Sequence, residues 1–260
     1  MKTSRVSLVL NRRQLLRASL LLLWLSARSC WAGAEAARSR NPEGDYVVLL
    51  HGLGRTTVSM KRLEWALEKA GHRVINESCP SIRLSIQDAA RCWLGRILKE
   101  RTPDRTARIH FVTHSWGGIV LRQYLAEQKI ENLSRVVMLA PPNQGSELAD
   151  KLKGNLLYQF ITGPSGQQLG TDASSAPRRL GRADFALGII AGDRTLNPAF
   201  SAWIPGPDDG KVSVRSTQLP GMRDWLVVHH SHTWMAWRKD VTVAVRQFLA
   251  RGHFGQRQQP

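Results

Sequence analysis

Cysteine and long hydrophobic runs are both scarce in this chain. Three cysteines occur in 260 residues, and the spacing of Cys79 and Cys92 excludes the CxxC pattern of a redox or structural zinc site. The sequence leaves open whether these two are bridged in an oxidising compartment or remain buried thiols. After the N-terminal segment no apolar run is long enough to cross a bilayer, which excludes a multispanning membrane protein. No internal repeat is present, so a repeat architecture is excluded as well.

Acidic residues are also few. The chain has 20 Asp and Glu against 37 Lys and Arg, which gives a formal net charge of +17 at pH 7. This surplus favours anionic partners such as acidic lipids or an anionic envelope surface. A nucleic-acid partner is not favoured, because the sequence contains no interleaved aromatic-basic motif and no nucleic-acid-binding module. The length and the 42% hydrophobic content fit one globular domain preceded by a leader.

The first 34 residues predict an export signal. They hold six Lys and Arg and no acidic residue, and residues 11–17 (NRRQLLR) resemble a twin-arginine motif with Asn11 in place of Ser or Thr. The apolar run at residues 18–27 is short for a permanent anchor, and residues 32–34 (AGA) offer a small-x-small cleavage site. Lipoprotein processing at Cys30 is disfavoured, because Arg28 makes residues 27–29 a poor lipobox. We expect a periplasmic or secreted protein of net charge +11, with an uncleaved signal anchor as the alternative.

The rest of the chain alternates between strand-like and helix-like patterns. Residues 35–44 are expected to be a linker, residues 45–250 one domain and residues 251–260 a basic tail. Strands are predicted at residues 45–50, 72–75, 108–113, 133–139, 185–190 and 225–228, and helices at 60–70, 86–98, 116–129 and 233–249. Residues 146–182 mix one short helical pattern with Gly, Pro, Ser and Gln, which predicts an insertion outside the sheet. The alternation predicts an α/β fold with a mostly parallel central sheet and helices on both faces.

A serine at a tight turn is the first candidate for chemistry. Residues 108–122 (RIHFVTHSWGGIVLR) contain an apolar β-branched run, then Ser115, then two glycines that begin an amphipathic segment. This layout predicts a nucleophile elbow, in which a strand–turn–helix raises a serine hydroxyl above a sheet. The turn requires small neighbours two positions on either side of the serine, and these are Thr113 and Gly117. Glycine is more usual at the position of Thr113.

Candidates for an acid and a base follow later in the chain. Asp208 and Asp209 lie in a loop rich in Gly and Pro, and His229, His230 and His232 precede the last predicted helix. A serine hydroxyl is a poor nucleophile at neutral pH, so a base must take its proton and a carboxylate should orient that base. The order Ser, Asp, His is the order in the α/β-hydrolase fold and differs from that of the other two main serine hydrolase architectures.

Together these motifs resemble those of α/β-hydrolases of the bacterial lipase/esterase type, over nearly all of the chain after the leader. The matching segments are residues 51–53 (HGL), 113–118 (THSWGG), 208–212 (DDGKV) and 231–233 (SHT). The resemblance implies that Ser115 is the nucleophile, Asp209 the catalytic acid and His232 the base. It also implies an oxyanion hole made by two backbone N–H groups, those of Leu53 and Trp116, and a reaction that needs no dissociable cofactor.

Other residues remain alternatives for these roles. Asp193 directly follows the predicted strand at residues 185–190, the commoner position for the acid in the wider fold, and Asp208 is a further candidate. His229 and His230 are close enough in sequence to replace His232 as the base. A metal site at the three histidines is disfavoured, because no cysteine or carboxylate accompanies them at ligand spacing. Two further histidines are expected to support the oxyanion loop and the elbow by hydrogen bonding: His51 and His114.

The predicted reaction is hydrolysis of a small-molecule or lipid carboxylic ester through an acyl-enzyme. The apolar residues of the insertion either line or cover an acyl pocket, or pack as an ordinary excursion against the sheet edge; they are Leu156, Leu157, Tyr158, Phe160 and Ile161. Trp116 is expected to offer one large apolar wall beside the nucleophile. Acyl transfer by the same triad, and a catalytically silent fold that binds lipid or a protein partner, are the alternative functions.

Overall fold

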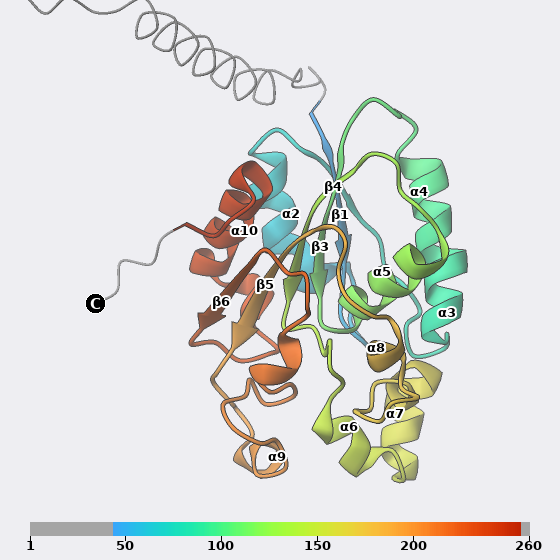
Figure 1. The fold of residues 1–260 in the computed structure, drawn as a ribbon, viewed down its shortest axis with the longest axis vertical. Helices are drawn as coiled ribbons and strands as arrows, with labels where there is room; N and C mark the ends of the chain where they lie inside the picture. Colours follow the sequence, from blue (N-terminus) through green and yellow to red (C-terminus); the bar gives the residue numbers. More distant parts are fainter. Residues whose placement is uncertain (1–43, 256–260) are drawn as a thin grey trace, which may run out of the picture. The chain divides into compact units, whose positions relative to one another are not determined.

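Six parallel strands form one sheet at the centre of the molecule (Figure 1). The computed structural model describes residues 44–255, so the predicted export signal, nearly all of the predicted linker and the end of the basic tail lie outside the described residues. The strand order is β2-β1-β3-β4-β5-β6, and every neighbouring pair is parallel. The strands are β1 (Tyr46–Leu50), β2 (Arg73–Asn76), β3 (Ile109–His114), β4 (Leu133–Leu139), β5 (Ala186–Gly192) and β6 (Asp224–Val228). The prediction of a mostly parallel sheet is confirmed.

Helices cover both faces of this sheet. On one face lie α2 (Lys61–Glu68) and α10 (Lys239–Arg251), and on the other lie α3 (Ile86–Asp88), α4 (Gly95–Arg101) and α5 (Trp116–Glu127) (Figure 1). The residues between α3 and α4, Ala89–Leu94, are π-helical, so one continuous helical stretch runs from α3 to α4. The last helix begins at Lys239 rather than at the predicted residue 233, because Met235–Trp237 forms a separate 3₁₀ turn.

The two covered faces explain why β1 is apolar at every position. Val47 and Leu49 pack into the cluster under α2 and α10, whereas Val48 and Leu50 pack into the cluster under α3 to α5. Side chains alternate between faces along a strand, so a strand with helices on both sides buries all of them. The same holds for β3 and β5, which are also buried throughout.

The insertion contains more helix than its sequence indicates. It forms α6 (Glu147–Leu152), α7 (Leu156–Gln167) and α8 (Ala176–Arg179), and α9 (Pro198–Ser201) follows β5. Ser146 and Asn155 cap α6 and α7 by accepting backbone N–H groups of the first turn. A kink at Gly163 and Pro164 divides α7. These helices are short and interrupted by glycine and proline, so their periodicity is weak in the sequence.

The two cysteines of the described residues are not bridged. Cys79 is buried and Cys92 is exposed, so the disulfide left open by the sequence is absent from this part of the chain. Burial raises the pKa of the Cys79 thiol to about 12 and keeps it protonated at neutral pH. Within residues 44–255, no helix combines the length and the apolar character that crossing a bilayer requires.

Helix α5 starts in very close contact with the end of β1. A Cβ at Gly117 would lie 2.6 Å from the carbonyl oxygen of Leu50 and 2.9 Å from that of His51. Both neighbours are backbone atoms at the end of a buried strand, so neither can move aside. Glycine at position 117 therefore fixes how closely the helix after Ser115 approaches the sheet.

We expect Gly117→Ala to lower the free energy of unfolding by about 1–3 kcal/mol, the usual cost of overpacking a close-packed site. Urea unfolding followed by tryptophan fluorescence measures this value. Gly95→Ala is the matched control, because its Cβ would meet the Tyr124 ring at an ordinary 3.7 Å. It should leave stability unchanged or raise it by up to about 1 kcal/mol through helix propensity. Equal losses in both variants would contradict the proposed contact.

Candidate active site

Ser115 occupies a strained turn between a strand and a helix. It follows His114, the last residue of β3, and precedes Trp116, the first residue of α5. Its φ and ψ are 53° and −121°, a region that residues with a side chain rarely adopt. The turn leaves the side chain partly exposed at the carboxyl end of the sheet. This geometry is that of the nucleophile elbow predicted from the sequence.

The threonine that departs from the usual elbow pattern is accommodated by a glycine on α5. A Cβ at Gly118 would lie 3.1 Å from the Thr113 hydroxyl oxygen and 3.2 Å from the Met138 sulfur. Thr113 is fully buried, so its side chain occupies space that a residue larger than glycine at position 118 would need. The two consecutive glycines therefore have different roles. The missing side chain of Gly117 leaves room for the end of β1, and that of Gly118 leaves room for the Thr113 side chain.

Asp209 and His232 form a buried hydrogen-bonded pair. The Nδ1 of His232 lies 2.7 Å from Oδ2 of Asp209, and both side chains are almost completely shielded from solvent. The other carboxylate oxygen accepts the backbone N–H groups of Lys211 at 3.0 Å and Val212 at 2.9 Å. The backbone N–H of His232 also donates to the Asp209 carbonyl, at 3.0 Å. These bonds fix the carboxylate and leave Nε2 as the ring nitrogen of His232 that faces away from it.

The alternative acids and bases have other partners. Asp193 pairs with His229 at 2.9 Å, and Asp240 pairs with His230 at 2.8 Å. Asp208 accepts the backbone N–H of Gly210 at 2.7 Å, as expected of a turn-forming aspartate. The three clustered histidines thus have three different carboxylate partners, and only the pair of Asp209 and His232 is buried.

His114 connects the elbow to the loop that carries His232. Its Nε2 donates to the carbonyl oxygen of His232 at 3.0 Å, and the two ring centroids are 4.8 Å apart. Complete burial, followed by the nearby positive charges, lowers the pKa of His114 well below its ordinary value. The ring is therefore a neutral donor at pH 7. In the described part of the chain no hydrogen bond joins Ser115 directly to His232, and such bonds are often long before substrate binds.

The turn that carries Leu53 lies directly against the elbow. A Cβ at Gly52 would be 3.5 Å from Cβ of Ser115. His51 holds this turn, because its Nε2 accepts the backbone N–H of Cys79 at 2.8 Å and its Nδ1 donates to the Gly52 carbonyl at 2.9 Å. Burial lowers the pKa of His51, which fits this neutral form.

The two predicted oxyanion donors are Leu53, in the turn after β1, and Trp116, the first residue of α5. Among the described residues, the backbone N–H groups of Leu53 and Trp116 make none of the backbone hydrogen bonds found in turns, loops and helix caps. The Trp116 side chain does not form the apolar wall expected from the sequence. It is fully buried, and its Nε1 donates to the Ser165 hydroxyl at 3.0 Å. Ser165 in turn donates to the Leu84 carbonyl at 2.8 Å, so this chain of bonds ties the elbow to α7.

Arg122 is a buried residue that the sequence analysis did not single out. Its guanidinium donates to Asn143 after β4, and to the carbonyl oxygens of Pro177 at 3.0 Å and Gly181 at 2.9 Å. Desolvation lowers the pKa of Arg122 to about 10, so the group is still charged at pH 7. It holds α5, the loop after β4 and α8 together. The only sign in the sequence is an arginine within the apolar stretch of α5.

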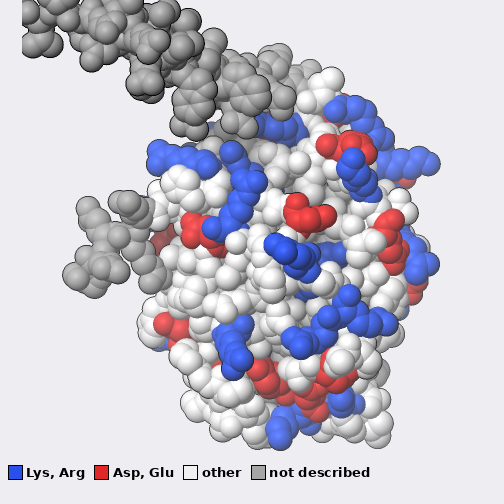
Figure 2. Space-filling view, viewed as in Figure 1, with Lys and Arg blue, Asp and Glu red and all other residues white. Residues whose placement is uncertain are grey.

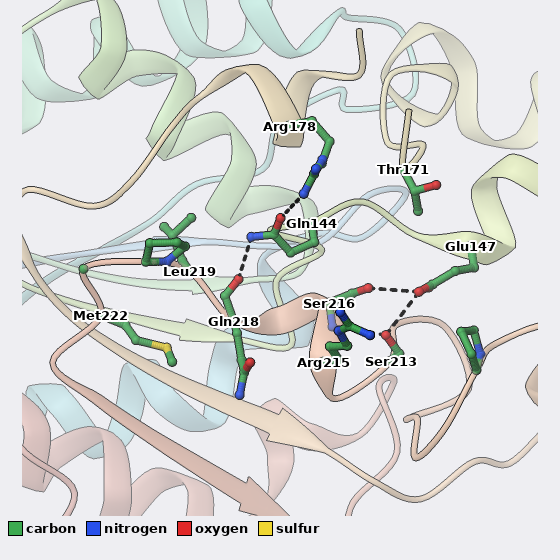
Figure 3. A pocket seen from close by; sticks show the side chains of 13 residues that line it. Gln144, Glu147, Thr171, Arg178, Ser213, Arg215, Ser216, Gln218, Leu219 and Met222 are labelled. Carbon is green, nitrogen blue, oxygen red and sulfur yellow. Dashed lines mark hydrogen bonds between the residues drawn. The ribbon is translucent and has the colours of Figure 1, made fainter. Parts of the chain in front are cut away.

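Glu147 of α6 braces the loop that carries Asp209, and a pocket opens beside these contacts (Figure 3). One carboxylate oxygen of Glu147 accepts the hydroxyls of Ser216 at 3.0 Å and Ser213 at 3.3 Å. The pocket has a volume of about 720 Å³, and Arg178 and Arg215 line it together with Glu147. Figure 3 shows Arg178 on Gln144, whose amide donates to the Gln218 carbonyl at 3.0 Å. None of the candidate catalytic residues lines this pocket.

Solved structures of several hydrolytic enzymes are similar to this chain. The mature form of the lipase BlEst2 from Bacillus licheniformis superposes with a TM-score of 0.61 at 18% identity, over 82% of this chain and 94% of that one. The metagenomic carboxyl esterase MGS0156 gives 0.59 at 20% identity, over 74% and 65%. The phospholipase PlaB from Legionella pneumophila gives 0.57 at 18%, over 73% and 53%, so the chain spans about half of that protein. The chain shares the α/β-hydrolase fold with these proteins.

The sequence itself matches a family defined without a function. No curated protein matches the chain. A family model described as a domain of unknown function (DUF7379) matches residues 16–177, more than half of the chain. The chain therefore belongs to the DUF7379 family and has the α/β-hydrolase fold.

Proposed function

We propose that this chain is a serine hydrolase that cleaves carboxylic esters, with Ser115 as nucleophile, His232 as base and Asp209 as the acid that orients the base. The observation that carries this proposal is the buried 2.7 Å hydrogen bond between Asp209 and His232. The pair adjoins the elbow of the strained Ser115 through His114, which donates to the His232 carbonyl. Burying a carboxylate costs free energy of desolvation even when it has a partner. A buried pair of this kind therefore calls for a functional explanation. Orientation of a catalytic imidazole supplies one.

The proposed reaction has two halves. Ser115 Oγ attacks the ester carbonyl while Nε2 of His232 takes the hydroxyl proton, and Asp209 stabilises the imidazolium that forms. His232 returns the proton to the leaving alcohol, and an acyl-enzyme remains on Ser115. Water then attacks the acyl carbonyl while His232 takes its proton. The tetrahedral intermediate collapses as His232 returns that proton to Ser115 Oγ, which releases the acid and restores the free serine. The N–H groups of Leu53 and Trp116 would stabilise the oxyanion in both halves.

The comparisons support the reaction class but not its substrate. A lipase, a carboxyl esterase and a phospholipase share the fold, and their printed activities belong to those proteins. Their common chemistry is cleavage of an ester, which is why we propose esters rather than peptides. The apolar side chains of the insertion do not enclose an acyl pocket: Tyr158 packs on the core, and Leu156, Leu157, Phe160 and Ile161 are exposed.

Glu147 is proposed to hold the acid in place. Asp209 and the two serines that Glu147 binds belong to one loop, and Ser146 donates to the Lys211 carbonyl of that loop at 2.9 Å. The position of Asp209 relative to His232 therefore depends on α6, which lies more than 60 residues earlier in the sequence. Because catalysis is sensitive to small displacements, loss of this brace should reduce the rate without removing any reacting group.

Ser115→Ala should abolish labelling by a fluorophosphonate probe and reduce hydrolysis of p-nitrophenyl esters by on the order of 10⁴-fold or more. Gel fluorescence measures the labelling, and release of p-nitrophenol measures the rate. Ser59→Ala is a control on a serine whose hydroxyl bonds only to a local carbonyl, and it should leave both unchanged. If the intact protein is not labelled, or if labelling persists without Ser115, the hydrolase proposal is wrong. If the hydrolysis rate does not change with the acyl length of the p-nitrophenyl ester, the protein is an esterase without the chain-length preference of a lipase.

Asp209→Asn should lower kcat by roughly 10⁴-fold, because the amide no longer stabilises the imidazolium or the required tautomer. The matched control is Asp193→Asn, which removes the carboxylate of the exposed pair with His229 and should change kcat less than about threefold. The base is tested in the same way, with His232→Ala against His229→Ala. A larger loss at Asp193 than at Asp209 would assign the acid to Asp193 instead.

Glu147→Ala should lower the free energy of unfolding by about 1–3 kcal/mol, because two serine hydroxyls lose their acceptor. It should also lower kcat for p-nitrophenyl esters, whereas Glu147→Gln keeps an acceptor oxygen and should retain most of the activity. Glu131→Ala removes a carboxylate whose partner, Lys129, is equally exposed, and should change stability by less than about 0.5 kcal/mol. An unchanged kcat in Glu147→Ala would show that the acid loop does not need this brace.

A further inference from the structure

Large apolar side chains are exposed at one end of the molecule, on the connections that leave the carboxyl ends of the strands. On the outer face of α7, Leu156 is 80% exposed and Phe160 is 84% exposed. These side chains, with others on neighbouring connections, form what we call the apolar rim: Ile82, Leu156, Leu157, Phe160, Ile161, Leu196 and Trp203. Single exposed apolar residues are ordinary, but a cluster of this kind marks a binding surface.

The apolar rim adjoins the candidate active site. Ile82 is the link, because a Cβ at Gly54, in the turn after Leu53, would touch the Ile82 side chain at 3.8 Å. On its other side, the backbone of Gly163 at the kink of α7 lies so close to the Ile82 carbonyl that no Cβ would fit. The exposed face of α7 is thus continuous, through Ile82, with the turn that lies against Ser115.

The charges of the same segments are of one sign. Residues 78–87, 151–171 and 194–207 supply the apolar rim, and they contain four cationic side chains and no Asp or Glu; the cations are Arg83, Lys151, Lys153 and Arg194. A carboxylate stands at each end of these segments: Glu77, Asp88, Asp150, Asp172, Asp193 and Asp208. Two of them, Asp150 and Asp172, lie 3.8 and 3.9 Å from Lys153. Figure 2 shows the margin over α9 as largely free of charged side chains. Apolar residues bordered by cations complement an anionic lipid surface.

The arrangement of the apolar rim also suits a broad, flat partner. Helices α6, α7 and α9 lie at the same end of the molecule (Figure 1). Four of the exposed residues lie on α7, whereas Leu196 and Trp203 flank α9. Trp203, after α9, stacks on Phe200 with ring centroids 6.0 Å apart and is still 43% exposed. A planar surface can contact the exposed side chains of α7 and those beside α9 at the same time.

We propose that the apolar rim docks on an anionic lipid surface, with Leu156, Leu157, Phe160 and Ile161 entering the interface and the neighbouring lysines and arginines binding lipid phosphates. This inference rests on the proposed ester hydrolysis in one respect: docking would place the candidate active site at the lipid surface, where an ester substrate would reach it. Docking itself requires no hydrolysis, so the two proposals can be tested separately.

The test is co-sedimentation with vesicles of phosphatidylcholine alone and of equimolar phosphatidylcholine and phosphatidylglycerol. The chain from Glu43 onward, a compact unit with all six strands and both hydrophobic clusters, avoids a contribution from the apolar run of the leader. Ser115→Ala is present throughout, so that hydrolysis plays no part. We expect Leu156→Ser with Phe160→Ser to lower the partition coefficient on anionic vesicles about tenfold or more.

The control is Trp65→Ser with Val243→Ser, which removes apolar side chains that are 53% and 45% exposed on α2 and α10 and should leave binding unchanged. Lys151→Gln with Lys153→Gln should weaken binding to anionic vesicles by about fivefold per lysine, with no effect on neutral ones. Lys99→Gln with Lys129→Gln is the control for charge.

Three results would overturn the docking proposal: unchanged binding in the Leu156 and Phe160 variant, equal losses in its control, or a changed oligomeric state with unchanged vesicle binding. The last would mean that a second copy of the chain covers the apolar rim. Hydrolysis of a soluble short-chain ester, measured with Ser115 restored, separates the proposals. Vesicle binding without any hydrolysis would remove the proposed function alone, and hydrolysis without rim-dependent binding would remove the docking alone.

Discussion

The hydrogen bond between Asp209 and His232 is the interaction on which the arrangement of the site depends. Both side chains are buried, so neither can exchange its partner for water without a large cost. The bond joins the connection after β5 to the connection after β6, two long segments that carry little regular structure. Both segments bury apolar side chains, such as Val212 and Met235, and polar contacts orient Asp209 and His232. Lys211 and Val212 orient the carboxylate, and the Asp209 carbonyl holds the backbone of His232.

The rest of the site is built on the sheet and is rigid for a different reason. Ser115 keeps its strained backbone because β3 and α5 are locked on either side of it, and Gly117 lets α5 begin against the end of β1. Apolar packing thus fixes Ser115, and hydrogen bonds hold Asp209 and His232 together. His114 connects the two parts, since it ends β3 and donates to the His232 carbonyl.

Much of this could be predicted from the sequence, because the signals are local. A buried parallel strand is a short apolar run, an elbow requires small residues around its serine, and the chain order of Ser115, Asp209 and His232 is informative. The brace by Glu147 and the buried Arg122 could not be predicted, because their partners are distant in sequence and carry no pattern. The exposure of Leu156 and Phe160 could not be predicted either, since an apolar residue in a short helix is usually buried.

The electrostatics of the site bear on which histidine would act as the base. The candidate site contains three buried imidazoles. Among the described residues, His51 and His114 have no carboxylate partner, and burial lowers the pKa of both. One ring nitrogen of His51 donates a hydrogen bond and the other accepts one, so neither nitrogen is free to take a further proton. His232 alone faces a carboxylate, and a proton that arrives on its Nε2 produces an imidazolium beside that negative charge. If Ser115 loses its proton to a histidine, His232 is the one that can hold it.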